Sequence, residues 1–191
     1  MIIGITGGTG CGKTTALNAI SLLGGKVIDC DRVYHTLLQK DKKLLSAIDA
    51  RFPGTVNDGI LNRSALAAIV FSDENALLDL NKITHGAVRQ EVLSLLGENP
   101  EFAAIDAIEL FEGGLARLCH VTVAVTAPRE IRVQRLMKRD GITQAQALMR
   151  INAQKPDDYF AKKCDYVLEN AATEEDFQKK CLVFFRNLLI I

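Results

Sequence analysis

A glycine-rich stretch near the N-terminus, residues 4–15 (GITGGTGCGKTT), ends on a lysine and two threonines. Residues 7–14 fit the pattern G-x-x-x-x-G-K-[ST] of a phosphate-binding loop. Phosphate oxygens can lie against such a backbone because no Cβ atoms intervene and successive N–H groups point inward. We expect Lys13 to reach the β- and γ-phosphates of a nucleotide and the Thr14 hydroxyl to hold Mg²⁺. Within this stretch, the predicted nucleotide contacts are Gly8, Thr9, Gly10, Cys11, Gly12, Lys13, Thr14 and Thr15; Arg135, later in the chain, is predicted to contact the nucleotide as well.

The surroundings of this loop favour a phosphate site over two alternatives. An apolar run at residues 2–6 precedes the loop, and apolar residues recur at helical spacing after it until Gly24-Gly25, as in a strand, loop and helix. A flexible glycine turn would not require Lys-Thr at that position. The dinucleotide pattern G-x-G-x-x-G begins at Gly8 but has Lys13 where its third glycine belongs.

Acidic residues end the second predicted strand, residues 26–29 (KVID), and continue as Asp29-Cys30-Asp31. Ligands of open α/β sheets bind beyond the carboxyl ends of the strands. A carboxylate there can accept a proton from an attacking hydroxyl, as phosphoryl transfer to an alcohol requires. Asp31 is therefore the predicted catalytic base. The alternative is that Asp31 caps the next helix.

Arginines cluster in a predicted helix over residues 129–139. Solvent exposure is the usual meaning of a charged run, and we assign it to Arg129 and Arg132. Arg135 and Arg139 are spaced i, i+4 and share one face, from which they could close over a triphosphate. Guanidinium groups suit phosphate oxygens and can stabilise charge on the transferred group. Arg139 is the predicted catalytic arginine.

Strands and helices alternate along the chain, which predicts an α/β fold with a mostly parallel, five-stranded sheet flanked by helices. Between about Asp31 and Gly97 the pattern is helix after helix, which indicates a helical insertion. A helix over residues 143–154 and a last amphipathic helix over residues 174–189 complete the pattern. The predicted strands are residues 2–6, 26–29, 102–108, 121–126 and 166–169.

Composition excludes several classes of protein. The net charge is +0 and there is no basic run, so no nucleic-acid partner is expected. The longest apolar stretches fall far short of the ~20 residues that a membrane span needs. The five cysteines form no C-x-x-C pair, and the first residues carry no charged leader or long apolar region, so we expect reduced thiols in a cytoplasmic protein.

Several segments together resemble the dephospho-CoA kinases: GITGGTGCGKTT, VIDCDRVYH, LNKITHGAV, IDAIELFE, VTVAVTAPREIRVQRLMKRDGIT, RINAQ and CDYVLEN. The phosphate loop alone belongs to a vast superfamily, but the combination is specific and covers nearly the whole chain. The resemblance implies a phosphate-loop NTPase fold of adenylate-kinase type, with a core at 1–30, 98–128 and 160–191. It also implies a helical CoA-binding domain at 31–97 and a mobile two-helix lid at 129–159.

The resemblance further implies transfer of the γ-phosphate of ATP, with Mg²⁺, to the ribose 3′-hydroxyl of dephospho-CoA, in the last step of coenzyme A synthesis. Carried onto this chain, Asp31 is the base, Lys13 and Thr14 contact phosphate and magnesium, and Arg139 is the lid arginine. Asn170 falls near the adenine and is likewise a predicted nucleotide contact. The residues on the acceptor side are Asp31, His85, Arg89, Asp106 and Glu112. Glu109 departs from the family, which often has a proline and a leucine before its Leu-Phe-Glu.

Three other functions stay open at this point. A different small-molecule kinase would use the same loop with another acceptor. A regulatory GTP switch is disfavoured because its Asn-Lys-x-Asp motif is absent; Asn81 begins NKIT instead. An ATP-binding module without turnover would leave Asp31 and Arg139 without a role. We expect a monomer whose partners are ATP and the acceptor.

Overall fold

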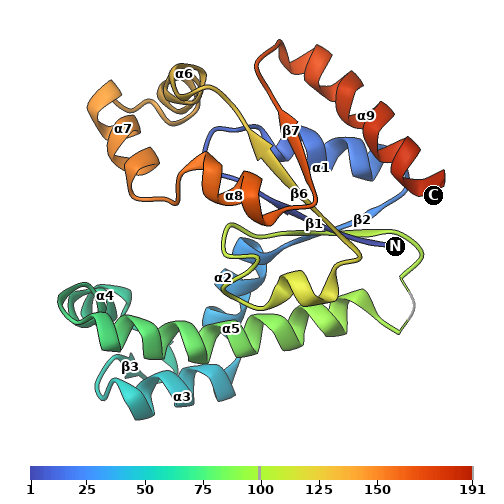
Figure 1. The fold of residues 1–191 in the computed structure, drawn as a ribbon. Helices are drawn as coiled ribbons and strands as arrows, with labels where there is room; N and C mark the ends of the chain where they lie inside the picture. Colours follow the sequence, from blue (N-terminus) through green and yellow to red (C-terminus); the bar gives the residue numbers. More distant parts are fainter. Residues whose placement is uncertain (99, 191) are drawn as a thin grey trace. The chain divides into compact units, whose positions relative to one another are not determined.

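A computed structural model describes residues 1–98 and 100–190 of the chain (Figure 1). The chain divides into two compact units, one of Met1–Ile28 with Asn99–Ile191 and the other of Asp29–Glu98. The predicted α/β fold class is confirmed, since five strands form one sheet and helices flank it.

The sheet is built around the first strand of the chain. β1 (Ile2–Thr6) pairs in parallel with β5 (Ala103–Asp106) on one side, with Ile3 opposite Ala104. On its other side it pairs in parallel with β6 (Val121–Thr126). β7 pairs in parallel with β6. The strands, in order across the sheet, are β2 (Lys26–Asp29), β5 (Ala103–Asp106), β1 (Ile2–Thr6), β6 (Val121–Thr126) and β7 (Tyr166–Glu169). All five predicted strands are present, and β5 is shorter than predicted.

Two helices from opposite ends of the chain pack together beside this sheet. α1 (Lys13–Leu22) follows the phosphate loop, and α9 (Glu174–Ile190) lies against it (Figure 1). Phe177 and Phe185 of α9 are fully buried and join Ile20 of α1 in the main core. Burying such aromatic side chains contributes on the order of 2–3 kcal/mol each. This core holds the start of α1, and therefore the phosphate loop, on the sheet.

Three helices separate β6 from β7. α6 (Arg129–Asp140) ends at Gly141, whose φ of 64° is the left-handed conformation that ends helices. α7 (Gln144–Asn152) begins with a capping box between Thr143 and Gln146. α8 (Asp157–Lys163) was not predicted from the sequence. Its signals are present nonetheless, because a proline precedes it, two aspartates begin it and two lysines end it.

The second unit consists of helices and one short hairpin around its own core, which includes Ile48 and Phe52. The sequence predicts a break at Asn57-Asp58-Gly59, and the structure has a hairpin there, with Asp58 and Gly59 both at positive φ. The sequence predicts two helices over residues 73–85 and 86–97, but the structure has a single helix there. The elements are α2 (Cys30–Lys40), α3 (Lys42–Arg51), β3 (Val56–Asn57), β4 (Ile60–Leu61), α4 (Arg63–Ser72) and α5 (Glu74–Leu96).

None of the helices in the described part of the chain is both long enough and apolar enough to cross a membrane.

A reciprocal set of hydrogen bonds joins β6 to the residue that precedes β7. The Asp165 carboxylate accepts hydrogen bonds from the N–H and the hydroxyl of Thr122, each at 2.7 Å. The Thr122 hydroxyl in turn accepts from the Asp165 N–H at 3.1 Å. These bonds favour the ionised carboxylate and lower the pKa of Asp165 below its ordinary value. Asp165 therefore stabilises the sheet when it is charged.

We expect Asp165→Asn to lower the free energy of unfolding by about 1 kcal/mol at neutral pH, because a charge-assisted hydrogen bond becomes a neutral one. Since the native pKa lies below the unfolded one, the wild-type advantage is present above pH ~4 and disappears as the pH falls through the native pKa. Urea unfolding at pH 7 and pH 3 measures the difference. Glu169→Gln, at the far end of β7, is the control, because the Glu169 side chain makes no hydrogen bond to the described residues, and only its backbone carbonyl accepts one, from Lys180. An undiminished difference at pH 3 would contradict this prediction.

Candidate active site

The phosphate loop adopts backbone angles that only glycine takes without strain. Gly7 has φ 141°, Gly10 has φ 77° and Gly12, at the start of α1, has φ 101°. A Cβ on Gly7 would also lie 2.2 Å from the Val125 carbonyl oxygen. These glycines explain the composition of the loop, because the chain must turn tightly against β6 and into α1.

The start of α1 presents positive charge toward the loop. No acidic residue occupies its first turn, so no carboxylate offsets the positive end of the helix. The Lys13 ammonium donates a hydrogen bond to the Gly7 carbonyl at 2.9 Å and so spans the loop. The Thr14 side chain is exposed and makes no hydrogen bond within residues 1–98 and 100–190. This is the arrangement that binds phosphate at helix N-termini.

Two side chains from later in the chain bind the backbone of Thr9 in the loop, one at its N–H and the other at its carbonyl. The Thr9 N–H donates to the Gln154 side-chain oxygen at 2.7 Å, and the Thr9 carbonyl accepts from Arg132 Nε at 2.8 Å. The expectation that Arg132 lies on a solvated face is wrong, since 4% of its side chain is exposed. Arg132 packs against Gly8 and Gly10, and the absence of side chains at these two glycines leaves room for it. Sequence reasoning assigned no role to Gln154.

Two of the predicted nucleotide contacts bind the loop from outside. Asn170 is buried, donates its amide to the Cys11 carbonyl at 3.0 Å and accepts from Arg135 Nη2 at 3.0 Å. A Cβ on Gly12 would lie 2.2 Å from the same amide nitrogen. Arg135 Nη1 also donates to the Gly10 carbonyl at 3.4 Å. Asn170 therefore supports the loop itself, and its approach to adenine stays a prediction.

The predicted catalytic arginine lies at the end of α6 and is engaged by its neighbour. Arg139 donates from Nε and Nη2 to the two carboxylate oxygens of Asp140, at 2.7 and 3.0 Å. Arg150 of α7 donates to the same carboxylate at 2.6 Å. The hydrogen bond from Arg139 is the main reason that the pKa of Asp140 lies below its ordinary value. Arg139 remains 62% exposed, so its guanidinium is accessible to solvent.

The loop cysteine is a packing residue. Cys11 is fully buried, and burial raises the pKa of its thiol despite the nearby positive charges of Lys13 and Arg132. A protonated, buried thiol is a poor nucleophile and a poor target for oxidants.

Of the predicted acceptor-side residues, two lie in the first unit. Asp106 ends β5, half-buried. Glu112 accepts a hydrogen bond from the Tyr159 hydroxyl of α8, and that hydroxyl also accepts from Lys163 at 2.8 Å. The hydrogen bond from Lys163 to the Tyr159 hydroxyl is the main reason that the pKa of Lys163 is raised above its ordinary value. Glu112 is thus tied to α8.

The other three lie in the second unit. Asp31 is exposed in the first turn of α2, and its carboxylate makes no hydrogen bond or ion pair with the described residues. The alternative that Asp31 caps this helix is wrong, because Asp29 is the cap and accepts the Arg32 N–H at 3.0 Å. His85 and Arg89 lie four residues apart on α5 and so share a face.

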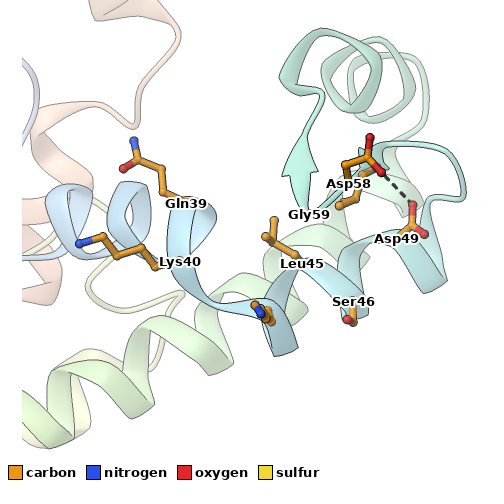
Figure 2. Close-up of a pocket in the computed structure, with 9 residues that line it drawn as sticks. Gln39, Lys40, Leu45, Ser46, Asp49, Asp58 and Gly59 are labelled. Atoms are coloured by element: carbon orange, nitrogen blue, oxygen red, sulfur yellow. Dashed lines mark hydrogen bonds between the residues drawn. The ribbon is translucent and has the colours of Figure 1, made fainter.

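The second unit also has a pocket of about 550 Å³ (Figure 2). Asp49 lies in its wall and accepts the N–H groups of Gly54 and Val56. None of the predicted acceptor residues lines it, so the pocket does not enter the candidate site. Its lining residues are Gln39, Lys40, Lys42, Leu45, Ser46, Asp49, Val56, Asp58 and Gly59.

Comparisons with known proteins agree with the geometry of the loop. A sequence profile of the dephospho-CoA kinase family, CoaE, matches residues 1–176. The dephospho-CoA kinase of Syntrophotalea carbinolica is 33% identical over 195 aligned residues, which cover 99% of this chain and 92% of that protein. The dephospho-CoA kinase of Anaeromyxobacter dehalogenans is 38% identical over 180 residues, covering 91% of this chain and 85% of that protein.

A solved structure shares the fold of this chain. A crystal structure from Thermus thermophilus matches 98% of this chain and 97% of its own length, with a TM-score of 0.79 and 34% identity. The family profile, the curated relatives and the intact phosphate loop agree, and this chain belongs to the dephospho-CoA kinase family.

Proposed function

We propose that this protein transfers the γ-phosphoryl group of ATP to the ribose 3′-hydroxyl of dephospho-CoA, giving CoA and ADP. The observation that carries the proposal is the loop between β1 and α1, with its left-handed glycines and Lys13 drawn across it, in a chain of this family. We also expect the protein to act as a cytoplasmic monomer.

On the donor side, the loop amides and the Lys13 ammonium bind the β- and γ-phosphates of ATP. The Thr14 hydroxyl fits a magnesium ligand, because it is exposed beside the loop and makes no hydrogen bond within the described residues. Bound Mg²⁺ would neutralise charge on the phosphates. Lys13 and the α1 N-terminus add positive charge from the protein, which stabilises the charge that develops during transfer.

On the acceptor side, Asp31 orients the ribose 3′-hydroxyl and takes its proton. The ribose oxygen bonds to the γ-phosphorus as the bond from that phosphorus to the bridging oxygen breaks, and the electron pair leaves with ADP. The support for Asp31 is its exposed carboxylate, which the cap at Asp29 leaves unengaged. We assign acceptor binding to His85, Arg89, Asp106 and Glu112.

The lid, residues 129–159, carries Arg139 toward the transferred phosphoryl group. Arg132, Arg135 and Gln154 lie inside these bounds and already contact the loop. We therefore expect closure to move the segment between them, which contains the α6–α7 turn. In closing, Arg139 exchanges the Asp140 carboxylate for phosphate oxygens and helps exclude water, which would otherwise act as acceptor.

Product analysis tests the proposed reaction directly. We expect incubation with ATP, Mg²⁺ and dephospho-CoA to yield ADP and a CoA species heavier by one phosphoryl group, measured by mass spectrometry. A panel of nucleoside monophosphates and metabolite alcohols serves as the control for acceptor choice. Faster ADP formation with one of those acceptors than with dephospho-CoA would contradict the proposal.

Asp31→Asn should retain ATP binding and lower kcat by about 10²–10⁴, the range for loss of a general base. ATP affinity by calorimetry and single-turnover transfer rates measure the two effects. Asp29→Asn is the matched control at the same strand end, because asparagine caps a helix as well as aspartate does. The base assignment would be wrong if Asp31→Asn turned over at the wild-type rate.

Arg139→Ala should lower kcat by about 10³, a typical effect for an arginine that stabilises the transferred phosphoryl group. The KM for ATP should change much less, because Arg139 is expected to act on charge that develops during transfer. Lys138→Ala removes an exposed positive charge one residue away and should have little effect. Equal losses in the two variants would indicate a general electrostatic effect instead of a specific contact.

A further inference from the structure

Arg132 is a buried charge that the reaction described above does not use. Burying a guanidinium is costly unless its charge is paired and its N–H groups are hydrogen-bonded. The side chain of Arg132 is only 4% exposed, whereas Arg129, one turn earlier on α6, is exposed. The contacts of Arg132 must therefore offset the cost of burying its charge.

Those contacts join the phosphate loop to α8. Arg132 Nε donates to the Thr9 carbonyl at 2.8 Å, and Nη1 donates to the Asp157 carboxylate at 2.6 Å. Asp157 is the first residue of α8 and is about two-thirds buried, at 32% exposure. An ion pair in so little water is screened weakly, so it orients the guanidinium firmly.

The third nitrogen of the guanidinium lies against the loop. Arg132 Nη2 is buried and has no hydrogen-bond partner among residues 1–98 and 100–190. A Cβ on Gly8 would lie only 2.3 Å from it, so the guanidinium occupies the place that a side chain at position 8 would take. The charge therefore sits on the loop backbone, and it lowers the pKa of the Cys11 thiol, although burial has the larger effect.

Thr9 is where these contacts act on the loop. Its carbonyl is held by Arg132 and its N–H by Gln154, so the peptides on both sides of Thr9 cannot rotate freely. The next residue, Gly10, has positive φ and would otherwise be among the most flexible in the loop. A loop that is already ordered loses less entropy when it binds phosphate.

We propose that Arg132 is a positioning residue for ATP, which acts through Thr9 to keep the loop in its phosphate-binding conformation and is itself oriented by Asp157. The inference rests on the proposed use of ATP as donor. The hydrogen bonds of the Arg132 side chain go to Thr9 and Asp157, and neither is assigned to the acceptor side, so its loss should weaken ATP binding and leave acceptor binding unchanged. The contact with Asp157 makes α8 a second support for the loop.

Calorimetric titration with ATP alone tests the proposal in three variants. Arg132→Gln keeps one donor for Thr9 but loses the ion pair, and we expect the Kd for ATP to rise about tenfold, as for one lost charge-assisted hydrogen bond. Asp157→Asn keeps an acceptor for Nη1 without its charge and should raise the Kd severalfold. Arg129→Gln, on the same helix, is the matched control and should bind ATP as the wild type does.

Steady-state kinetics and thermal melts separate positioning from a merely structural role. Positioning predicts a raised KM for ATP with an unchanged KM for dephospho-CoA, at temperatures well below the melting point. A lowered melting temperature with wild-type Kd for ATP in both Arg132→Gln and Asp157→Asn would overturn the proposal. If Arg132→Gln does not fold, Asp157→Asn decides. The ATP titration needs no acceptor, so a wrong assignment of dephospho-CoA leaves this result interpretable.

Discussion

The structure depends on one constraint: the main-chain N–H groups of the phosphate loop must already point at a common site before an anion is bound there. Converging N–H groups repel one another, and the backbone angles they require at Gly7 and Gly12 are ones that other residues rarely adopt. The packing of α1 against α9 holds one end of the loop, and pairing of β1 within the sheet holds the other. The loop itself is supported by side chains that bind its outward carbonyl groups.

These supports come from far along the chain. Arg132 lies 123 residues from Thr9, and Asn170 lies 159 residues from Cys11. Each donates to a loop carbonyl, which leaves the N–H groups on the opposite side of the peptides for phosphate. Asn170 also accepts from Arg135, so one buried amide orders both the loop and a guanidinium beside it. The shape of the nucleotide site therefore depends on the complete first unit.

Local patterns carried most of what the sequence could predict. The loop motif, its flanking strand and helix and the five strands depend on near neighbours, and all of them are present. The exposure of Arg132 could not be predicted, because it is decided by Gly8 and Gly10, which are distant in sequence and lack side chains. The single helix α5 passes through Gly86 because residues such as Val88 and Leu80 remain buried on either side, and their packing outweighs the ~1 kcal/mol that glycine costs. Glu112 was assigned from resemblance, which could not reveal its bond to Tyr159.

The arginines of α6 differ in how easily they can be released. The two arginines that pair with Asp140, Arg139 and Arg150, are exposed, and such surface pairs contribute little to stability. A triphosphate offers more charge than one shared carboxylate, so transferring Arg139 to it costs little. Breaking the pair between Arg132 and Asp157 would leave a buried guanidinium unpaired, which costs several kcal/mol. Burial thus separates the roles that we propose, because the exposed arginine is free to follow the lid while the buried one must stay with the loop.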